Sequence, residues 1–326
     1  MTALEADRSL DPASTAPERI EWSSDGATVT GERRPGTRLA RIRAIDGASA
    51  AAIEAFTAAA AARGCVTIRA ELPAGDPALA TLADVGFRSI DPAVHAGQPV
   101  RPVVRMERRL DGPGSSRALP YFSQTTWFTC GPVALMLAAG RLGVPLPVDR
   151  RSEVALWREA TTVHAPAGPG GCEPFGIACA ASRRGLRTRV VSTIEGPFLM
   201  DRAADAGKRD LMLFVQAEFR SEARERGVGV EIREWTRHDL DATLAAGGVA
   251  IVLIDQILFQ GHPMPHWVLV HSVADDTYWI DDPWVDAEEG ETDTDKFDVP
   301  VPARELERMA WWGATPYRVA VLLEPC

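Results

Sequence analysis

Short runs in which apolar and polar residues alternate, a pattern typical of strands, occur along this chain. Longer runs with the periodicity of helices lie between them. Residues 1–37 are polar and rich in turn formers, which predicts a mostly disordered or irregular segment. The pattern over residues 38–112 predicts a small α/β unit, followed by a linker at 111–116. Within this unit we expect strands at 37–45, 65–72 and 103–110 and helices at 50–62 and 76–85, the first capped by Ser49 and the second stopped by Gly86.

The third region, residues 117–326, begins with helices and ends in strands, an order typical of an α+β domain. A glycine- and proline-rich loop is expected at 161–171. Two strands are expected to form a hairpin that turns at Asp275-Asp276. The predicted helices are 130–142, 174–184, 201–226 and 239–246, and the predicted strands are 186–192, 249–254, 266–273, 277–280 and 318–323.

Composition narrows the class of protein. The chain has 326 residues and a net charge of −10, which argues against nucleic acid as a main partner. The longest apolar runs, such as 249–254, are too short to cross a membrane, and the N-terminus lacks the pattern of a secretory signal. Five cysteines without metal-ligand spacing predict free thiols in a reducing compartment, hence the cytoplasm. We expect no metal and no cofactor, and the oligomeric state stays open.

One stretch carries candidate chemistry, Tyr121-Phe-Ser-Gln-Thr-Thr-Trp-Phe-Thr-Cys-Gly-Pro132. Cys130 is followed by Pro132 and an apolar run of good helix formers, so it is expected at the start of a helix. The positive end of a helix dipole stabilises a thiolate. Gln124 carries an amide that could donate to the oxyanion formed when a thiolate attacks a carbonyl. The stretch therefore suggests a cysteine nucleophile with an oxyanion donor.

Such a nucleophile needs a histidine base and a polar group that orients it. His266 begins one strand of the predicted hairpin and Asp282 follows the other, so both lie on the same side of the sheet. Asp282 could then fix the tautomer of the His266 ring. His271 competes as the base but faces the other side of its strand, and Asp281 competes with Asp282.

Each of these residues also has a purely structural interpretation. Cys130 could be a buried helix cysteine and His266 a satisfied polar residue, but the ordered set of glutamine, cysteine, histidine and aspartate favours a site. Around it, Trp127 and Trp267 could line a cleft or pack in a core. Three further residues could line the cleft: His262, Gly171 and Cys172. His262 could instead be an exposed loop histidine, and Cys172 a structural thiol in the glycine-rich loop.

Residues 119–326 resemble the bacteriocin-leader-peptidase branch of the papain-like cysteine peptidases. The matching pieces are the stretch at 121–136, Pro265-His-Trp-Val-Leu-Val270 and Tyr278-Trp-Ile-Asp-Asp-Pro283. Gly170 to Ile177 and Arg183 to Leu186 resemble a stand-alone, cytoplasmic subfamily. The resemblance implies a papain-like fold, a helical part followed by an antiparallel sheet. It also implies these roles: nucleophile Cys130, base His266, orienting acid Asp282 and oxyanion donor Gln124.

In that subfamily the peptidase-like domain follows a GNAT acetyltransferase-like domain, and residues 38–110 resemble the second half of one. Acetyltransferases bind the coenzyme A pyrophosphate with backbone N–H groups of a basic, glycine-rich turn. Here the turn reads Asp46-Gly-Ala-Ser-Ala-Ala51, with one glycine, no arginine and an aspartate that repels phosphate. We therefore expect a degenerate module with a structural or docking role.

These observations predict a cysteine-dependent hydrolase, a peptidase or amidohydrolase, that acts through a thioester on Cys130 with His266 as base. Its partner would be a peptide or amide-containing substrate. An amine in place of water as acceptor would make it an acyl or peptidyl transferase. A hypothesis from another class is a non-catalytic peptide-binding protein of the same fold. The sequence leaves the substrate and the acyl acceptor open.

Overall fold

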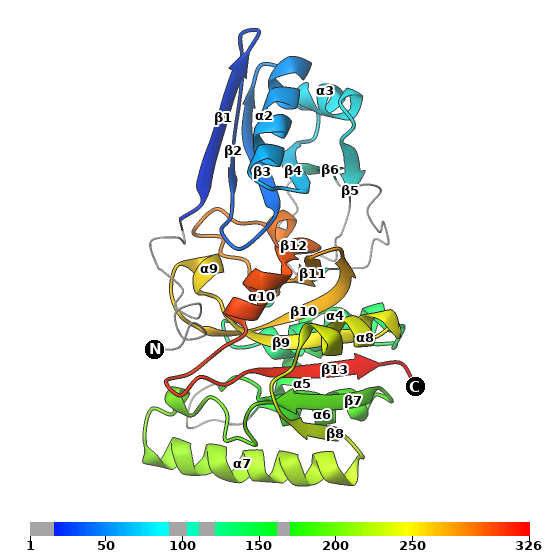
Figure 1. The fold of residues 1–326 in the computed structure, drawn as a ribbon, viewed down its shortest axis with the longest axis vertical. Coiled ribbons are helices and arrows are strands. Elements are labelled where there is room, and N and C mark those ends of the chain that lie inside the picture. Colours follow the sequence, from blue (N-terminus) through cyan, green and yellow to red (C-terminus); the bar gives the residue numbers. More distant parts are fainter. Residues whose placement is uncertain (1–15, 91–102, 111–120, 162–169) are drawn as a thin grey trace.

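The computed structural model describes residues 16–90, 103–110, 121–161 and 170–326, and two sheets organise them (Figure 1). The first sheet has six strands in the order β1-β2-β3-β4-β6-β5. The second has seven in the order β12-β11-β10-β9-β13-β7-β8. Helices accompany both sheets, which fits the predicted α+β class. None of the helices in the described ranges has both the length and the apolar character needed to cross a membrane.

From residue 39 onward the N-terminal unit follows the predicted order of elements with one addition, the short strand β5, which the pattern did not predict. Ser49 caps α2 by accepting from the N–H of Ala52, as expected, and Gly86 follows α3 with a φ of 90°. Ile53 and Phe56 of α2 are fully buried against the sheet. The elements are β1 (Glu18–Ser24), β2 (Ala27–Arg33), β3 (Leu39–Asp46), α2 (Ala50–Ala62), β4 (Thr67–Pro73), α3 (Ala78–Asp84), β5 (Arg88–Ile90) and β6 (Val103–Arg109).

The prediction of an irregular segment over residues 1–37 is wrong for its second half. Strands β1 and β2 form a hairpin there, and Ser24 pairs with Ala27. The two residues between them, Asp25 and Gly26, have φ values of 52° and 73°, the left-handed pair that a tight hairpin turn requires. The turn formers in this segment thus end strands and do not indicate disorder. Residues 1–15 and the predicted linker at 111–116 lie outside the described residues.

The second unit contains the predicted Cys130 helix and the predicted hairpin. Among its described residues are also six elements that the pattern did not predict: α5, β8, α9, η3, β12 and α10. Its first half holds α4 (Cys130–Arg141), α5 (Arg150–Ala160), α6 (Pro174–Ser182), β7 (Arg187–Ser192), η2 (Met200–Arg202), α7 (Ala206–Glu225), β8 (Gly229–Ile232) and α8 (Arg237–Ala245). Its second half holds β9 (Val249–Asp255), α9 (Ile257–Gln260), β10 (Pro265–Ala274), β11 (Thr277–Asp281), η3 (Asp293–Asp295), β12 (Val299–Pro302), α10 (Ala303–Met309) and β13 (Val319–Glu324).

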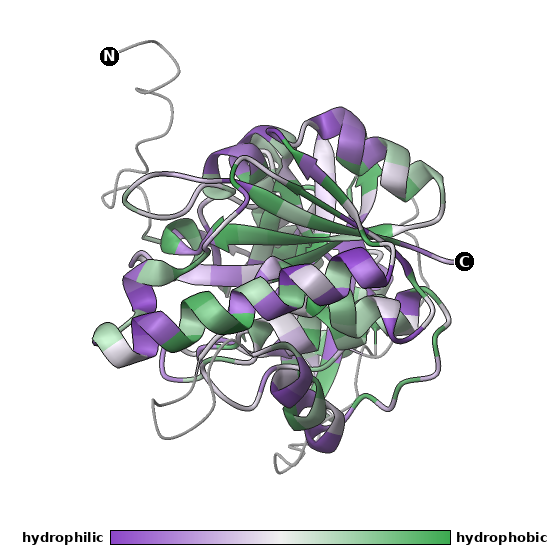
Figure 2. Cartoon of the chain, turned by 90° about the horizontal axis from the view of Figure 1, so that it is seen from below, coloured by the Kyte–Doolittle hydropathy of each residue, from purple (hydrophilic) through white to green (hydrophobic). Residues whose placement is uncertain are grey.

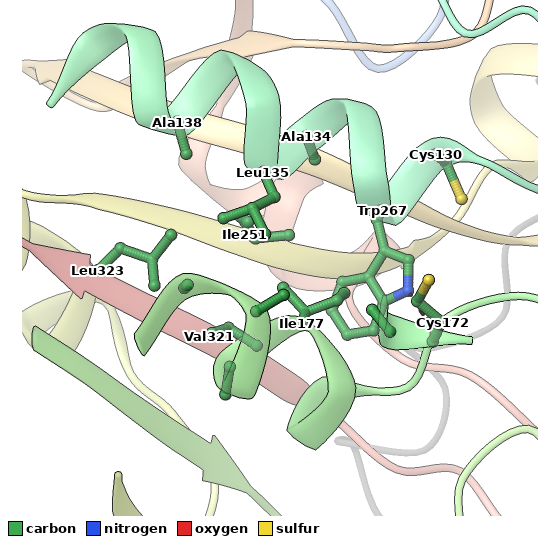
Figure 3. Packing of buried hydrophobic residues seen from close by; sticks show 14 of the residues in the cluster. Cys130, Ala134, Leu135, Ala138, Cys172, Ile177, Ile251, Trp267, Val321 and Leu323 are labelled. Carbon is green, nitrogen blue, oxygen red and sulfur yellow. Dashed lines mark hydrogen bonds between the residues drawn. The ribbon is translucent and has the colours of Figure 1, made fainter. Parts of the chain in front are cut away.

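The large sheet is covered on both faces. On one face, α4 and α6 bury residues such as Leu135 and Ile177 against Ile251 and Val321 (Figure 3). On the other face, α8 and α10 cover the alternate positions of the same strands. Burial on both sides explains why β9 is almost continuously apolar. Figure 2 accordingly shows largely hydrophobic strands inside and hydrophilic stretches on the surrounding helices.

The hairpin β1–β2 predicts a sensitive position at Gly31. A Cβ there would collide with the Arg41 carbonyl oxygen and would lie 2.6 Å from the Phe56 ring. We expect Gly31→Ala to lower the free energy of unfolding by about 2 kcal/mol, because the buried site has no room to adjust. Thr30→Ala on the same strand serves as the control in urea denaturation. Equal stability of the two variants would contradict the packing of this hairpin on α2.

Candidate active site

Cys130 is the first residue of helix α4, as the sequence predicts, and its side chain is largely buried. The loop before it is held by Glu153 of α5, a fully buried carboxylate. Glu153 accepts from the Thr125 N–H and hydroxyl, each at 2.7 Å, and from the Thr129 hydroxyl. The thiol is therefore fixed at the positive end of a helix by a loop with little freedom.

His266 and Asp282 meet at the edge where the hairpin strands begin and end. His266 is the second residue of β10, and Asp282 directly follows β11. The antiparallel pairing of Leu269 with Asp281 brings the two side chains together. The His266 Nε2 atom lies 2.7 Å from Asp282 Oδ1, and both residues are buried. Asp282 is thus the carboxylate that the fold gives to His266.

The Asp282 carboxylate is held on all sides. Its Oδ1 also accepts from the Trp284 N–H at 2.9 Å, and its Oδ2 accepts from Lys296 Nζ at 2.9 Å. Its backbone carbonyl accepts from the Tyr121 hydroxyl at 2.5 Å. With so many partners the carboxylate has one orientation, and that orientation fixes the His266 ring.

The charges of these groups support one another. Burial alone would raise the pKa of the Cys130 thiol, but its hydrogen bond with His266, the charge of that ring and backbone N–H groups of Trp267 and Gly131 outweigh burial and lower it. Burial would lower the pKa of His266, but the Asp282 carboxylate and Cys130 raise it to about 9. Despite its burial, Lys296 and His266 hold the pKa of Asp282 well below its usual range.

These shifts define the chemistry that the site can perform. Because Asp282 accepts the Nε2 proton, the other ring nitrogen, Nδ1, is left for the Cys130 thiol. A thiol whose pKa is lowered beside an imidazole whose pKa is raised exists as a thiolate–imidazolium pair over the pH range between them. The arrangement can therefore supply a nucleophile and a proton donor together.

Gln124 lies beside the same strand end, although its side-chain amide has other partners. Its backbone N–H donates to the Pro283 carbonyl at 2.8 Å. Its Nε2 donates to the Thr126 carbonyl at 2.7 Å, and its buried Oε1 has no hydrogen-bond partner among the described residues. One N–H of the amide is thus committed to the loop before Cys130. The oxyanion role of Gln124 remains a prediction.

The competing candidates form a separate cluster. Asp281 accepts from Arg141 at 3.0 and 2.8 Å, and His271 lies 3.6 Å from Asp281 and 3.1 Å from Asp298. The ligand atoms of His271, Asp281 and Asp298 lie within 4.8 Å of one another, so they have the spacing of a metal site. Arg141, however, donates to both carboxylates and already provides the positive charge.

A pocket of about 290 Å³ lies beside Cys130. Four of the residues expected to line a cleft do so: Trp127, Gly171, Cys172 and Trp267. The rest of the wall combines apolar residues with three charged ones: Phe128, Leu199, Met212, Leu253, Met264 and Pro265, with Asp201, Arg202 and Lys208.

His262 lies apart from this pocket, and its role in substrate binding stays a prediction. His262 is exposed, and its Nδ1 lies 3.0 Å from the Gln260 carbonyl, beyond the end of the short helix α9. It is absent from the lining of the pocket in the described part of the chain. The short helix α9, which the pattern did not predict, ends at Gln260 and is followed by Gly261 with a φ of 74°, so His262 lies in the turn after this helix.

Cys172 is both buried and next to the candidate nucleophile. The Trp267 indole N–H donates to its carbonyl at 3.0 Å. A Cβ on Gly131 would lie 3.2 Å from the Cys172 Cβ, so the glycine lets the start of α4 approach closely. Burial, and to a lesser extent Cys130, raises the pKa of Cys172 well above its usual range. Cys172 therefore stays a protonated thiol in the pocket wall (Figure 3).

Sequence reasoning missed Lys296 and Glu153. Lys296 lies in the acidic stretch Asp293-Thr-Asp-Lys296, where a lysine is normally solvated, yet it is fully buried. Glu153 looks like an ordinary charge in the first turn of a helix. Only Glu153 gave a sequence signal. It lies three residues before Leu156 and seven before Ala160, the spacing of one helix face, so a carboxylate is placed on the buried side of α5.

A comparison with known protein families gives a match over the second unit. A family model described as a Peptidase_C39-like family covers residues 119–324, which includes every residue of the candidate site. A search of curated proteins gave no match. The matched range starts after the N-terminal sheet and spans the whole second unit.

The lowered pKa of Cys130 predicts selective alkylation. At pH 6 an ordinary thiol with a pKa near 8.5 is about 0.3% ionised. We expect iodoacetamide to label Cys130 faster than the exposed Cys326, and His266→Ala to abolish the difference. Peptide mass spectrometry after timed labelling measures both sites in one sample. Labelling of Cys130 no faster than that of Cys326 would contradict the thiolate–imidazolium pair.

Proposed function

The chain belongs to the Peptidase_C39-like family, and on this premise we propose that it is a cysteine-dependent hydrolase that cleaves a peptide or amide bond through a thioester on Cys130. One observation carries the proposal: buried His266, whose Nε2 lies 2.7 Å from buried Asp282, lowers the pKa of the Cys130 thiol at the start of α4. This is the combination of nucleophile, base and orienting acid that covalent acyl transfer requires.

In the proposed reaction His266 Nδ1 takes the thiol proton, and the Cys130 sulfur attacks the carbonyl carbon. The tetrahedral oxyanion lies near the free N–H of Cys130 at the helix start, with the Gln124 amide as the second donor. As the C–N bond breaks, His266 gives its proton to the leaving amine and a thioester remains. Water, deprotonated by His266, then hydrolyses the thioester and restores the thiol.

Asp282 keeps the ring in one tautomer throughout this cycle and stabilises the imidazolium. Its own pKa lies well below the usual range, so it stays ionised during the reaction. The pocket beside Cys130 offers both apolar residues, such as Met212 and Leu253, and charged ones, such as Lys208, and we place the acyl part of a peptide substrate there.

The proposed roles predict the behaviour of three variants on a peptide library. We expect cleavage products with the unmodified protein, and a thioester adduct on Cys130 trapped by rapid acid quenching. Cys130→Ala and His266→Ala should lower the rate at least about a thousandfold. Asp281→Asn, beside Arg141, serves as the matched control for Asp282→Asn, because only the second removes the group bonded to His266.

The outcomes separate the alternatives. An adduct that forms on Cys130 but passes to added amines faster than to water would identify a transferase. Peptide binding without an adduct would identify a non-catalytic binding protein and would overturn the proposal.

The raised pKa of His266 predicts the alkaline limit of activity. Because His266 must be protonated to release the amine, kcat should fall as the pH rises through about 9. On the acid side, activity should persist below the ordinary thiol pKa, since that of Cys130 is lowered. The pH profile of kcat on one cleaved peptide checks this. A fall centred near the ordinary histidine value of about 6.5 would contradict the effect of Asp282.

A further inference from the structure

Lys296 brings a buried positive charge to the rear of the candidate site. Its side chain is completely inaccessible, and its Nζ lies 2.9 Å from Asp282 Oδ2 and 2.8 Å from Glu291 Oε2. A buried ammonium persists only where carboxylates compensate it. Lys296 thus depends on these two carboxylates, one of which is the partner of His266.

Glu291 connects this lysine to the N-terminal sheet. Its Oε1 pairs with the guanidinium of Arg34, the residue directly after β2. Its Oε2 also accepts from the Asp286 N–H at 2.8 Å. Charges of alternating sign therefore run from the N-terminal sheet to the candidate base, through Arg34, Glu291, Lys296, Asp282 and His266.

The backbone that carries Lys296 is also held by the N-terminal sheet. Arg69 of β4 is fully buried and donates to the carbonyls of Thr294 at 3.0 Å, Phe297 at 2.6 Å and Asp298 at 3.1 Å. Arg41 of β3 pairs with Asp295 in the same segment. The segment between β11 and β12 therefore lies between the two sheets, and its shape depends on arginines of the first (Figure 1).

We propose that Lys296 is a positioning residue of the active site, and that the N-terminal sheet fixes it through Arg34 and Glu291. Lys296 has no contact with the thiol and acts through Asp282. It occupies Oδ2 of the carboxylate and so leaves Oδ1 for the His266 ring. This inference rests on the proposed cysteine chemistry, and it makes the N-terminal unit a part of the site although the family match begins at residue 119.

The rate of Cys130 alkylation as a function of pH tests this. The charged groups around the Lys296 ammonium are Asp282, Glu291, Arg34 and Asp295. Lys296→Met leaves the site more negative and frees the Asp282 carboxylate to turn. The midpoint of thiolate formation should therefore rise by about half a pH unit, which slows alkylation at pH 6 about threefold. A merely structural lysine would change the folded fraction without moving this midpoint.

A double-mutant cycle tests the connection to the N-terminal sheet. Arg34→Gln should slow Cys130 alkylation in the unmodified background, and its effect should shrink in the Lys296→Met background, because Arg34 acts through Lys296. The matched control is Arg108→Gln, which breaks a 2.8 Å pair with Glu54 inside the N-terminal unit and touches nothing in the segment at 282–298. Additive effects of Arg34→Gln and Lys296→Met would overturn the coupling.

The same measurements separate failure of this inference from failure of the proposed function. If the unmodified protein shows no fast, His266-dependent labelling of Cys130, the cysteine chemistry itself fails. If it does label fast, an unchanged midpoint in Lys296→Met overturns the positioning role alone. If Lys296→Met does not fold, the variant of the partly exposed Arg34 provides the test. Identical midpoints of Cys130 thiolate formation in Arg34→Gln and Arg108→Gln would overturn the inference.

Discussion

The hydrogen bond between His266 and Asp282 is the interaction on which the candidate site depends. It connects the start of β10 with the end of β11, next to the start of α4. This one short contact sets the orientation, the tautomer and the charge of the His266 ring. Asp282 raises the pKa of the His266 ring, and the charge of the protonated ring in turn lowers the pKa of the Cys130 thiol beside it. The stability of the folded site and the reactivity of its thiol therefore depend on the same buried charges.

Those charges extend beyond the site into the other sheet. Lys296 compensates Asp282, Glu291 compensates Lys296, and Arg34 compensates Glu291. Buried ion pairs add little to stability compared with apolar packing, but removing one partner leaves an uncompensated charge. A chain of such pairs connects the two units, which supports the structural function that we propose for the N-terminal unit. The absence of a phosphate-binding turn in its sequence, at Asp46 to Ala51, is consistent with that function.

Much of the fold could be predicted because local patterns determine it. The run after Cys130 forms a helix for reasons of propensity, and the hairpin of β10 and β11 follows from alternation and a turn. The position of Asp282 beside His266 then follows from hairpin geometry. What could not be predicted depends on contacts distant in sequence. Lys296 is buried because two carboxylates compensate its charge, and one of them, Glu291, is paired with an arginine from the other unit. His262 follows a short helix that local patterns did not predict. The β1–β2 hairpin was missed although its Asp25-Gly26 turn is a local signal, because turn formers were interpreted as disorder.

The central claim is that Asp282 keeps His266 protonated beside the Cys130 thiolate. The most direct test is an NMR titration of the His266 ring in the full-length protein with ¹⁵N-labelled histidine. We predict an imidazolium at pH 7.5 that titrates at a pKa of about 9, and a lower pKa in Asp282→Asn, where the carboxylate charge is gone. A ring that is neutral at pH 7.5, or one whose titration is unchanged in Asp282→Asn, would contradict the account.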